Sequence, residues 1–170
     1  MTLINACHEL AAVCGRIVSA ESEISAHDFL RVLGSTVAGI DPGLEGIVDL
    51  ARGGSNEIWG TGFAAEFDDG TNGQARHFAG VAAAVVIFGG RLTDMITNRF
   101  LDDPDTADGR LSAMAVEFAG LVLNGDLPLA STPDWIVDNI CAAQPDAPAD
   151  RKSTRLNSSH CLVSRMPSSA

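Results

Sequence analysis

A polar cluster precedes the longest apolar run of this chain, and its residue types could carry out acid–base chemistry. The cluster contains Glu66, Asp68, Asp69, Arg76 and His77. Two carboxylates beside an apolar wall can be held in different protonation states, which is what hydrolysis by general acid and base requires. Glu66 and Asp69 would share a face if this segment turned helically. The pattern therefore allows a lysozyme-like hydrolase with Glu66 as the acid, Asp69 as the second carboxylate and His77 assisting.

The same residues also have a structural interpretation. Asp68 and Asp69 would stabilise the positive end of a following helix, and His77 would occupy a core position. Asp68, Arg76 and Trp59 are then candidates for binding. No Walker motif, GxSxG, HExxH or CxxC occurs in the chain. The leading interpretation is therefore a soluble, acidic helical domain with a binding or structural role and without catalysis. The lysozyme-like hydrolase remains the alternative.

An aspartate-rich segment at residues 102–108 does not fit a calcium loop. An EF-hand loop starting at Asp103 would place Asp108 where glycine is required and Met114 where glutamate is required. Asp105 or Thr106 is instead expected to cap the following helix. We expect neither a metal nor a cofactor in this protein.

Three cysteines precede residue 150, at positions 7, 14 and 141. Cys7 and Cys14 are about 10.5 Å apart by helical rise, and a disulfide needs Cα atoms within roughly 7 Å. His8 lies about 100° around the helix from Cys7, so the three side chains do not converge on a metal. The odd count and the lack of CxxC favour reduced thiols and a cytoplasmic location. His8 and Glu9 also interrupt the apolar start that a secretory signal needs.

Residues 150–170 resemble translated sequencing adapter. A common short-read library adapter encodes DRKSTRLNSSH, and its continuation after the sample index encodes SRMPSSA. We expect this segment to be artefactual and disordered, and residues 144–149 to be a tail rich in Pro, Ala and Asp. The true gene could then continue past Ala149.

The chain is strongly acidic. It has 11 basic and 22 acidic residues, and a net charge of −11. The adapter-like segment holds four of the bases and one of the acids, so residues 1–149 keep 7 bases and 21 acids, a net charge of −14. Such a surface argues against nucleic acid, whose phosphates need a basic face. The expected partner is a protein or a small molecule.

The longest apolar run, residues 78–90, is expected to be a core helix. Its 13 residues fall short of the about 20 that cross a bilayer, so no transmembrane span is expected. Gly80 and Ala84 on one face would let a second helix over residues 111–123 approach closely. QARHF at residues 74–78 resembles the start of the apolar helix in VanZ-like proteins, which has the pattern DKxxHF. Gln74 stands where that pattern has lysine, and no activity is transferred.

Apolar residues at helical spacing predict an all-α fold, a compact bundle of about six helices in one domain over residues 1–143. Residues 55–73 are expected to form a long loop with apolar anchors at Ile58, Trp59, Phe63 and Phe67. The expected helices begin with Thr2–Ala20, a helix capped by Ser25 with Asp28, and a helix from Asp41–Pro42 to Gly53. The central run follows, capped by Thr71 or Asn72 and broken at Gly89. The last ones are Arg91–Leu101, Arg110–Leu123 and a helix beginning at Ser131.

Overall fold

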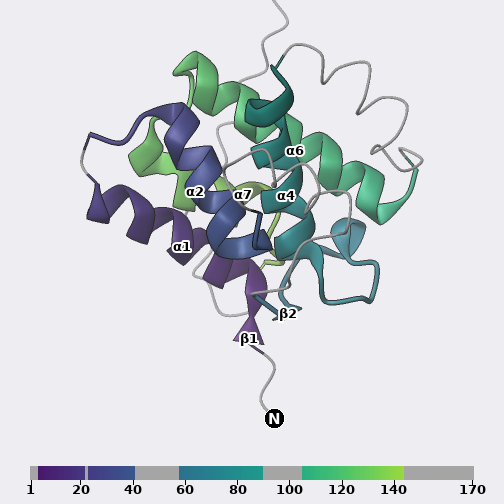
Figure 1. The fold of residues 1–170 in the computed structure, drawn as a ribbon. Helices are drawn as coiled ribbons and strands as arrows, with labels where there is room; N and C mark the ends of the chain where they lie inside the picture. Colours follow the sequence, from purple (N-terminus) through teal and green to yellow (C-terminus); the bar gives the residue numbers. More distant parts are fainter. Residues whose placement is uncertain (1–3, 22, 41–57, 90–104, 144–170) are drawn as a thin grey trace, which may run out of the picture.

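The computed structural model describes residues 4–21, 23–40, 58–89 and 105–143. Its described part holds five α-helices, two 3-10 turns and two strands of two residues each (Figure 1). The predicted all-α class is confirmed, with five helices where about six were expected. The helices expected at residues 41–53 and 91–101, and the tail from residue 144, lie outside the described residues. The elements are β1 (Ile4–Asn5), α1 (Ala6–Ala20), α2 (Ala26–Ala38), β2 (Gly60–Thr61), η1 (Ala65–Phe67), α4 (Gln74–Phe88), α6 (Ala107–Asn124), η3 (Leu129–Ser131) and α7 (Thr132–Asn139).

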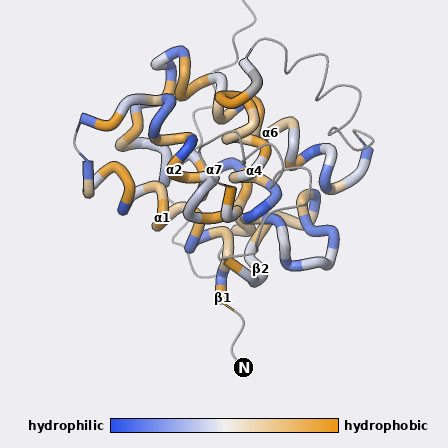
Figure 2. Tube along the Cα trace, viewed as in Figure 1, coloured by the Kyte–Doolittle hydropathy of each residue, from blue (hydrophilic) through white to orange (hydrophobic). Residues whose placement is uncertain are grey.

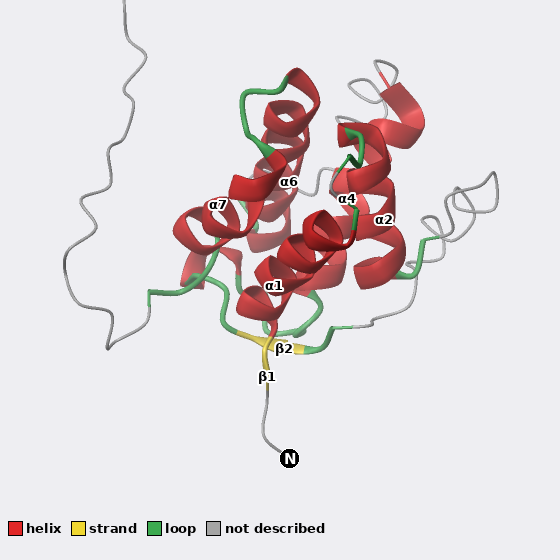
Figure 3. Ribbon diagram, turned by 90° about the vertical axis from the view of Figure 1, so that its left-hand side faces the viewer, coloured by secondary structure: helices red, strands yellow, loops and turns green. Residues whose placement is uncertain are grey.

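Helix α4 is the centre of the packing, as expected of the apolar run. It contacts α2 and α6, while α1 packs against α2 and α7. Figure 3 shows the small sheet of β1 and β2 at one end of this helical bundle, and Figure 2 shows apolar and polar positions alternating along the helices around the core. Phe78, Ala79 and Ala82 of α4 are fully buried. None of the described helices is long and apolar enough to cross a membrane.

Several helix boundaries follow the local signals in the sequence. The Ser25 hydroxyl accepts a hydrogen bond from the Asp28 N–H at 3.1 Å and donates one to the Asp28 carboxylate at 2.7 Å. Thr106 caps α6 by accepting from the Gly109 N–H at 3.1 Å. Gly125 ends α6 in the left-handed region, with φ 78°. The predicted caps at Ser25 and Thr106 are confirmed.

The first helix begins later than the predicted Thr2. Asn5 is its N-cap, and the Asn5 side chain accepts a hydrogen bond from the His8 N–H at 3.0 Å. Ile4 precedes the helix in β1, where it pairs in parallel with Gly60. It is 49% exposed and lies outside α1. Pairing with a segment 56 positions later along the chain therefore overrides helical periodicity at this end.

The predicted cap of the central helix is also wrong. The N-cap residue of α4 is Gly73, and no side chain bonds to the first turn from that position. Asn72 is left-handed, with φ 59°, a conformation that Asn tolerates better than most residues. The Thr71 hydroxyl is bonded to Asp69 instead. The predicted break at Gly89 is confirmed, since this residue ends the helix with φ 56°.

The loop before α4 has three of its four expected anchors. Ile58, Phe63 and Phe67 are buried, whereas Trp59 is 55% exposed. The loop is anchored by its other apolar side chains, so the Trp59 indole is left for contact with solvent or a partner.

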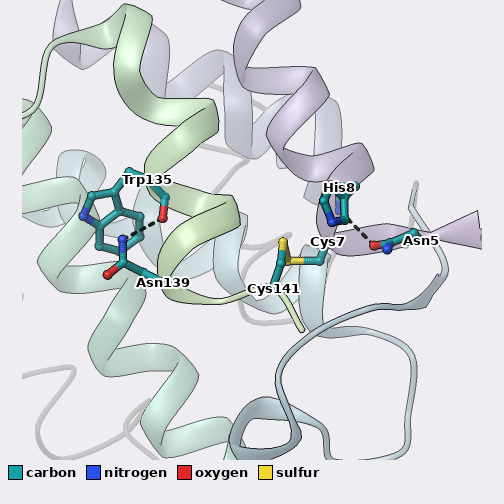
Figure 4. Close-up of a disulfide and its surroundings, with 6 residues drawn as sticks. All are labelled: Asn5, Cys7, His8, Trp135, Asn139 and Cys141. Carbon is teal, nitrogen blue, oxygen red and sulfur yellow. Dashed lines mark hydrogen bonds between the residues drawn. A yellow bond between two sulfur atoms is a disulfide. The ribbon is translucent and has the colours of Figure 1, made fainter. Parts of the chain in front are cut away.

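A disulfide joins Cys7 at the start of α1 to Cys141 just after α7 (Figure 4). The expectation of reduced thiols is therefore wrong for this pair, while the expectation that Cys7 and Cys14 do not pair with each other is confirmed. Cys14 is a buried free cysteine. The pairing joins residues 134 positions apart, so no local spacing could have indicated it.

The disulfide sits where three distant segments meet. Cys141 forms an antiparallel bridge with Phe63, in the segment that follows β2, and β2 in turn pairs with β1. Together they tie the start of α1, the loop after β2 and the end of α7 into one unit. The bridge consists of two backbone bonds, from the Ala64 N–H to the Ile140 carbonyl at 2.9 Å and from the Ala142 N–H to the Gly62 carbonyl at 2.8 Å.

Small residues on α4 permit another helix to approach closely. In the structure, α2 makes such a close approach. A Cβ added to Gly34 of α2 would overlap the Cβ of Ala83 and approach the Ala79 carbonyl oxygen at 3.6 Å. The expected approach was to the helix over residues 111–123. That helix, α6, also packs on α4.

We predict that Gly34→Ala lowers the free energy of unfolding by about 1–3 kcal/mol, because the added methyl overpacks the α2–α4 contact. Gly120→Ala is the matched control, since a Cβ on Gly120 of α6 meets nothing within 4 Å. The control should be neutral or stabilising by up to about 1 kcal/mol, as expected for Gly to Ala in a helix. Urea denaturation followed by circular dichroism measures both variants. Equal stability of the two would refute the close contact.

Candidate functional site

The acidic turn between η1 and α4 is ordered by its own carboxylates. Asp68 Oδ1 accepts a hydrogen bond from the Gly70 N–H at 2.9 Å. Asp69 Oδ1 accepts from the Thr71 N–H at 2.9 Å and from the Thr71 hydroxyl at 2.8 Å. Each aspartate thus bonds to the backbone two residues further on, which is the geometry of an Asx turn. Both carboxylates have a structural role in shaping the approach to α4.

Gln74 joins these two carboxylates to the central helix. Its side-chain Nε2 donates to Asp69 Oδ1 at 2.6 Å and to Asp68 Oδ1 at 3.2 Å. The residue is only 2% exposed. Its Oε1 atom is buried and accepts no hydrogen bond within the described structure. Gln74 therefore anchors the turn to the core, a role that the sequence analysis did not assign.

His77 lies one helical turn further along α4 and is bonded to another helix. Its Nε2 atom is 2.7 Å from the hydroxyl oxygen of Ser112 on α6. Ser112 is fully buried and His77 is half-buried. Ser112 has a recognisable signal in retrospect, because it precedes the buried Ala115 and Ala119 at helical spacing. The bond places the imidazole in the α4–α6 interface.

We predict that His77 and Ser112 are energetically coupled. His77→Ala, Ser112→Ala and the double variant form a double-mutant cycle. Each single variant is expected to lose about 1–2 kcal/mol, because it leaves a polar partner unsatisfied in the interface. The double variant should lose less than the sum, with a coupling of about 0.5–1.5 kcal/mol. Denaturant unfolding measures all four proteins, and strictly additive losses would show that the bond contributes nothing.

The segment from Glu66 to Asp69 does not continue as a helix, so the condition under which Glu66 and Asp69 would share a face is not met. The 3-10 turn η1 ends at Phe67, and Asp68 is extended with φ −92° and ψ 107°. The side chain of Glu66 is exposed. Its backbone carbonyl accepts a hydrogen bond from Arg110 Nε of α6 at 3.0 Å, so the contribution of Glu66 to the fold comes from its main chain.

The structure brings some of the candidate residues together and separates others. Asp68 and Asp69 meet at Gln74, while no hydrogen bond or ion pair within the described residues links Glu66, Asp69 and His77 to one another. Arg76 lies half-buried in the first turn of α4. Trp59 is exposed beside β2.

Cys14 is the free cysteine of the described residues, and it is buried. Burial raises the pKa of the Cys14 thiol to about 12. A thiol with such a pKa is protonated at neutral pH, and it is the thiolate that attacks electrophiles or binds metals. Within the described ranges, no group of three or more His, Cys, Asp or Glu side chains could hold a metal ion.

Comparison of the chain with protein-family models, with curated protein sequences and with solved structures found no match.

Proposed function

We propose that this chain is an acidic helical domain that binds a partner without catalysis. The observation that carries this proposal is the hydrogen bonding of the two groups with the most catalytic promise. Both oxygens of Asp69 accept from Thr71, and the His77 ring bonds to a buried serine. Groups that are held in such bonds stabilise the turn and the helix interface.

The alternative is a lysozyme-like hydrolase. That reaction needs one carboxyl group that protonates the leaving group and a second carboxylate facing the same bond. Glu66 would be the acid, Asp69 the second carboxylate and His77 an assisting group. The hydrogen bonds of Asp69 and His77 run to Thr71 and to α6, which favours the non-catalytic function.

Hydrolase assays separate the two functions. The intact protein is incubated with bacterial cell-wall polysaccharide and with chitin oligomers, beside Glu66→Gln, Asp69→Asn and His77→Gln. We expect the wild-type protein to release no more reducing sugar than these variants or the buffer. Glu117→Gln, an exposed change on α6, serves as the matched control. Release by the wild type and the control that is lost in the three variants would establish the hydrolase.

The disulfide indicates the kind of cellular compartment in which such a domain would fold. Disulfides form and persist in oxidising compartments and are rare in the cytoplasm. Cys7 is fully buried and Cys141 partly so, which suits a structural bond. We therefore propose maturation in an oxidising compartment, in place of the cytoplasmic location first expected.

Thiol counting tests this location. Protein that is denatured and alkylated together at lysis should keep Cys7 and Cys141 unmodified by the reagent if it was folded in an oxidising compartment, while Cys14 is modified. The same protein made in a reducing cytoplasm should take up the reagent at all three of these cysteines. Complete alkylation of material recovered from its natural location would contradict the proposal.

A further inference from the structure

Trp59 is the most exposed large apolar side chain in the described ranges. It is 55% exposed, and Ile4, at 49%, follows it. The two lie close in the fold, because Ile4 pairs with Gly60, the residue after Trp59. The strands are at one end of the helical bundle, away from the core formed by the helices (Figure 3). Tryptophan is among the residues that most often dominate a protein interface.

The acidic turn of Asp68 and Asp69 is joined through the backbone to the strand that follows Trp59. The Gly60 N–H donates a hydrogen bond to the Asn72 carbonyl at 3.4 Å, which holds β2 against the acidic turn. Asp68 and Asp69 of that turn are exposed. Within the described part of the chain, the hydrogen bonds to these carboxylates come from neutral donors, namely backbone N–H groups, Thr71 and Gln74. No arginine or histidine among the described residues forms an ion pair with either carboxylate.

We infer that Trp59 and the acidic turn of Asp68 and Asp69 form a docking surface for a basic polypeptide segment. An arginine or lysine of the partner would lie over the indole face, where a cation is attracted to the ring. Neighbouring basic side chains would pair with the two carboxylates. This inference rests on the proposed binding function and adds the surface and the class of partner.

Charge selects this partner over other occupants. The chain has a net charge of −11, so a second copy or a nucleic acid would meet like charge at this surface. A basic segment meets opposite charge, which raises the association rate and excludes acidic competitors. The apolar ring then supplies the close contact that charge alone does not provide.

The test uses the full chain and a nine-residue peptide rich in arginine and lysine, without aromatic residues. Isothermal titration calorimetry measures Kd for the wild type, for Trp59→Ala and for the double variant Asp68→Asn/Asp69→Asn. Asparagine keeps the oxygen that accepts the turn hydrogen bonds, so the double variant removes charge while preserving the turn. Glu21→Gln is the matched control, at the far end of α1 from the sheet.

We expect Trp59→Ala to raise Kd about tenfold or more, and the double variant to raise it about three- to tenfold and to reduce its salt dependence. Glu21→Gln should bind as the wild type does. A wild-type protein that does not bind the basic peptide, or a Trp59→Ala variant that binds it unchanged, overturns this inference and leaves the proposed binding function in place. The hydrolase result described above would instead overturn the proposed function itself.

Discussion

Replacing Cys7 and Cys141 together by alanine is expected to lower the free energy of unfolding by about 3–5 kcal/mol, near the top of the range for a single disulfide. The reason is the length of the loop that the bond closes. The two cysteines are 134 positions apart, and the chain entropy that a cross-link removes from the unfolded state grows with loop length. The loop contains every described helix, so its opening affects the whole domain.

Reduction provides the internal control for this prediction. Dithiothreitol should lower the melting temperature of the wild type towards that of the double variant, and it should leave the variant unchanged. Differential scanning calorimetry with and without the reductant measures both proteins. If dithiothreitol reduces the disulfide and the melting temperature of the wild type stays the same, the bond does not stabilise the domain.

Phe118→Ala is expected to cost about 3–5 kcal/mol, the usual loss for removing a buried aromatic side chain. Phe118 of α6 is fully buried. Its ring centroid lies 6.5 Å from that of Phe29 on α2, 5.3 Å from that of Phe78 on α4 and 5.1 Å from that of Trp135 on α7. One ring therefore connects four helices, and its loss would leave a cavity where they meet.

Phe118→Leu is the matched comparison, because it keeps most of the apolar volume and should lose about half as much or less. Guanidinium unfolding measures the stability of both variants. The fluorescence of Trp135, which packs against the replaced ring, reports the local change in Phe118→Ala. A loss below about 1 kcal/mol in Phe118→Ala would mean that the surrounding helices close the cavity, and that the aromatic cluster is not central to stability.

The candidate site was only partly predictable. The sequence placed Asp68, Asp69 and His77 at the start of the central helix, and the structure has them there. It did not indicate that Ser112, 35 positions away, would bond to His77. Nor did it indicate Arg110, which bonds to the Glu66 carbonyl from 44 positions away. Both partners come from α6, and only the packing of α6 on α4 brings them within reach.

The sequence by itself determined the all-α class, the buried central run and several helix ends. Ser25 caps with Asp28 three residues away, and Gly125 ends α6 through its own backbone conformation. These features involve residues within one helical turn of each other, so the local pattern contains all the information they need.

Only the tertiary structure decided the disulfide, the small parallel sheet and the exposure of Trp59. Cys7 has the spacing of an ordinary core residue on α1, and Ile4 continues the same apolar stripe. Their partners, Cys141 and Gly60, are 134 and 56 positions away. The periodicity of apolar residues along a helix indicates which side chains are buried, but it does not indicate which distant surface will cover them. That choice depends on how all the helices pack at once, because an interior at native density accepts few arrangements.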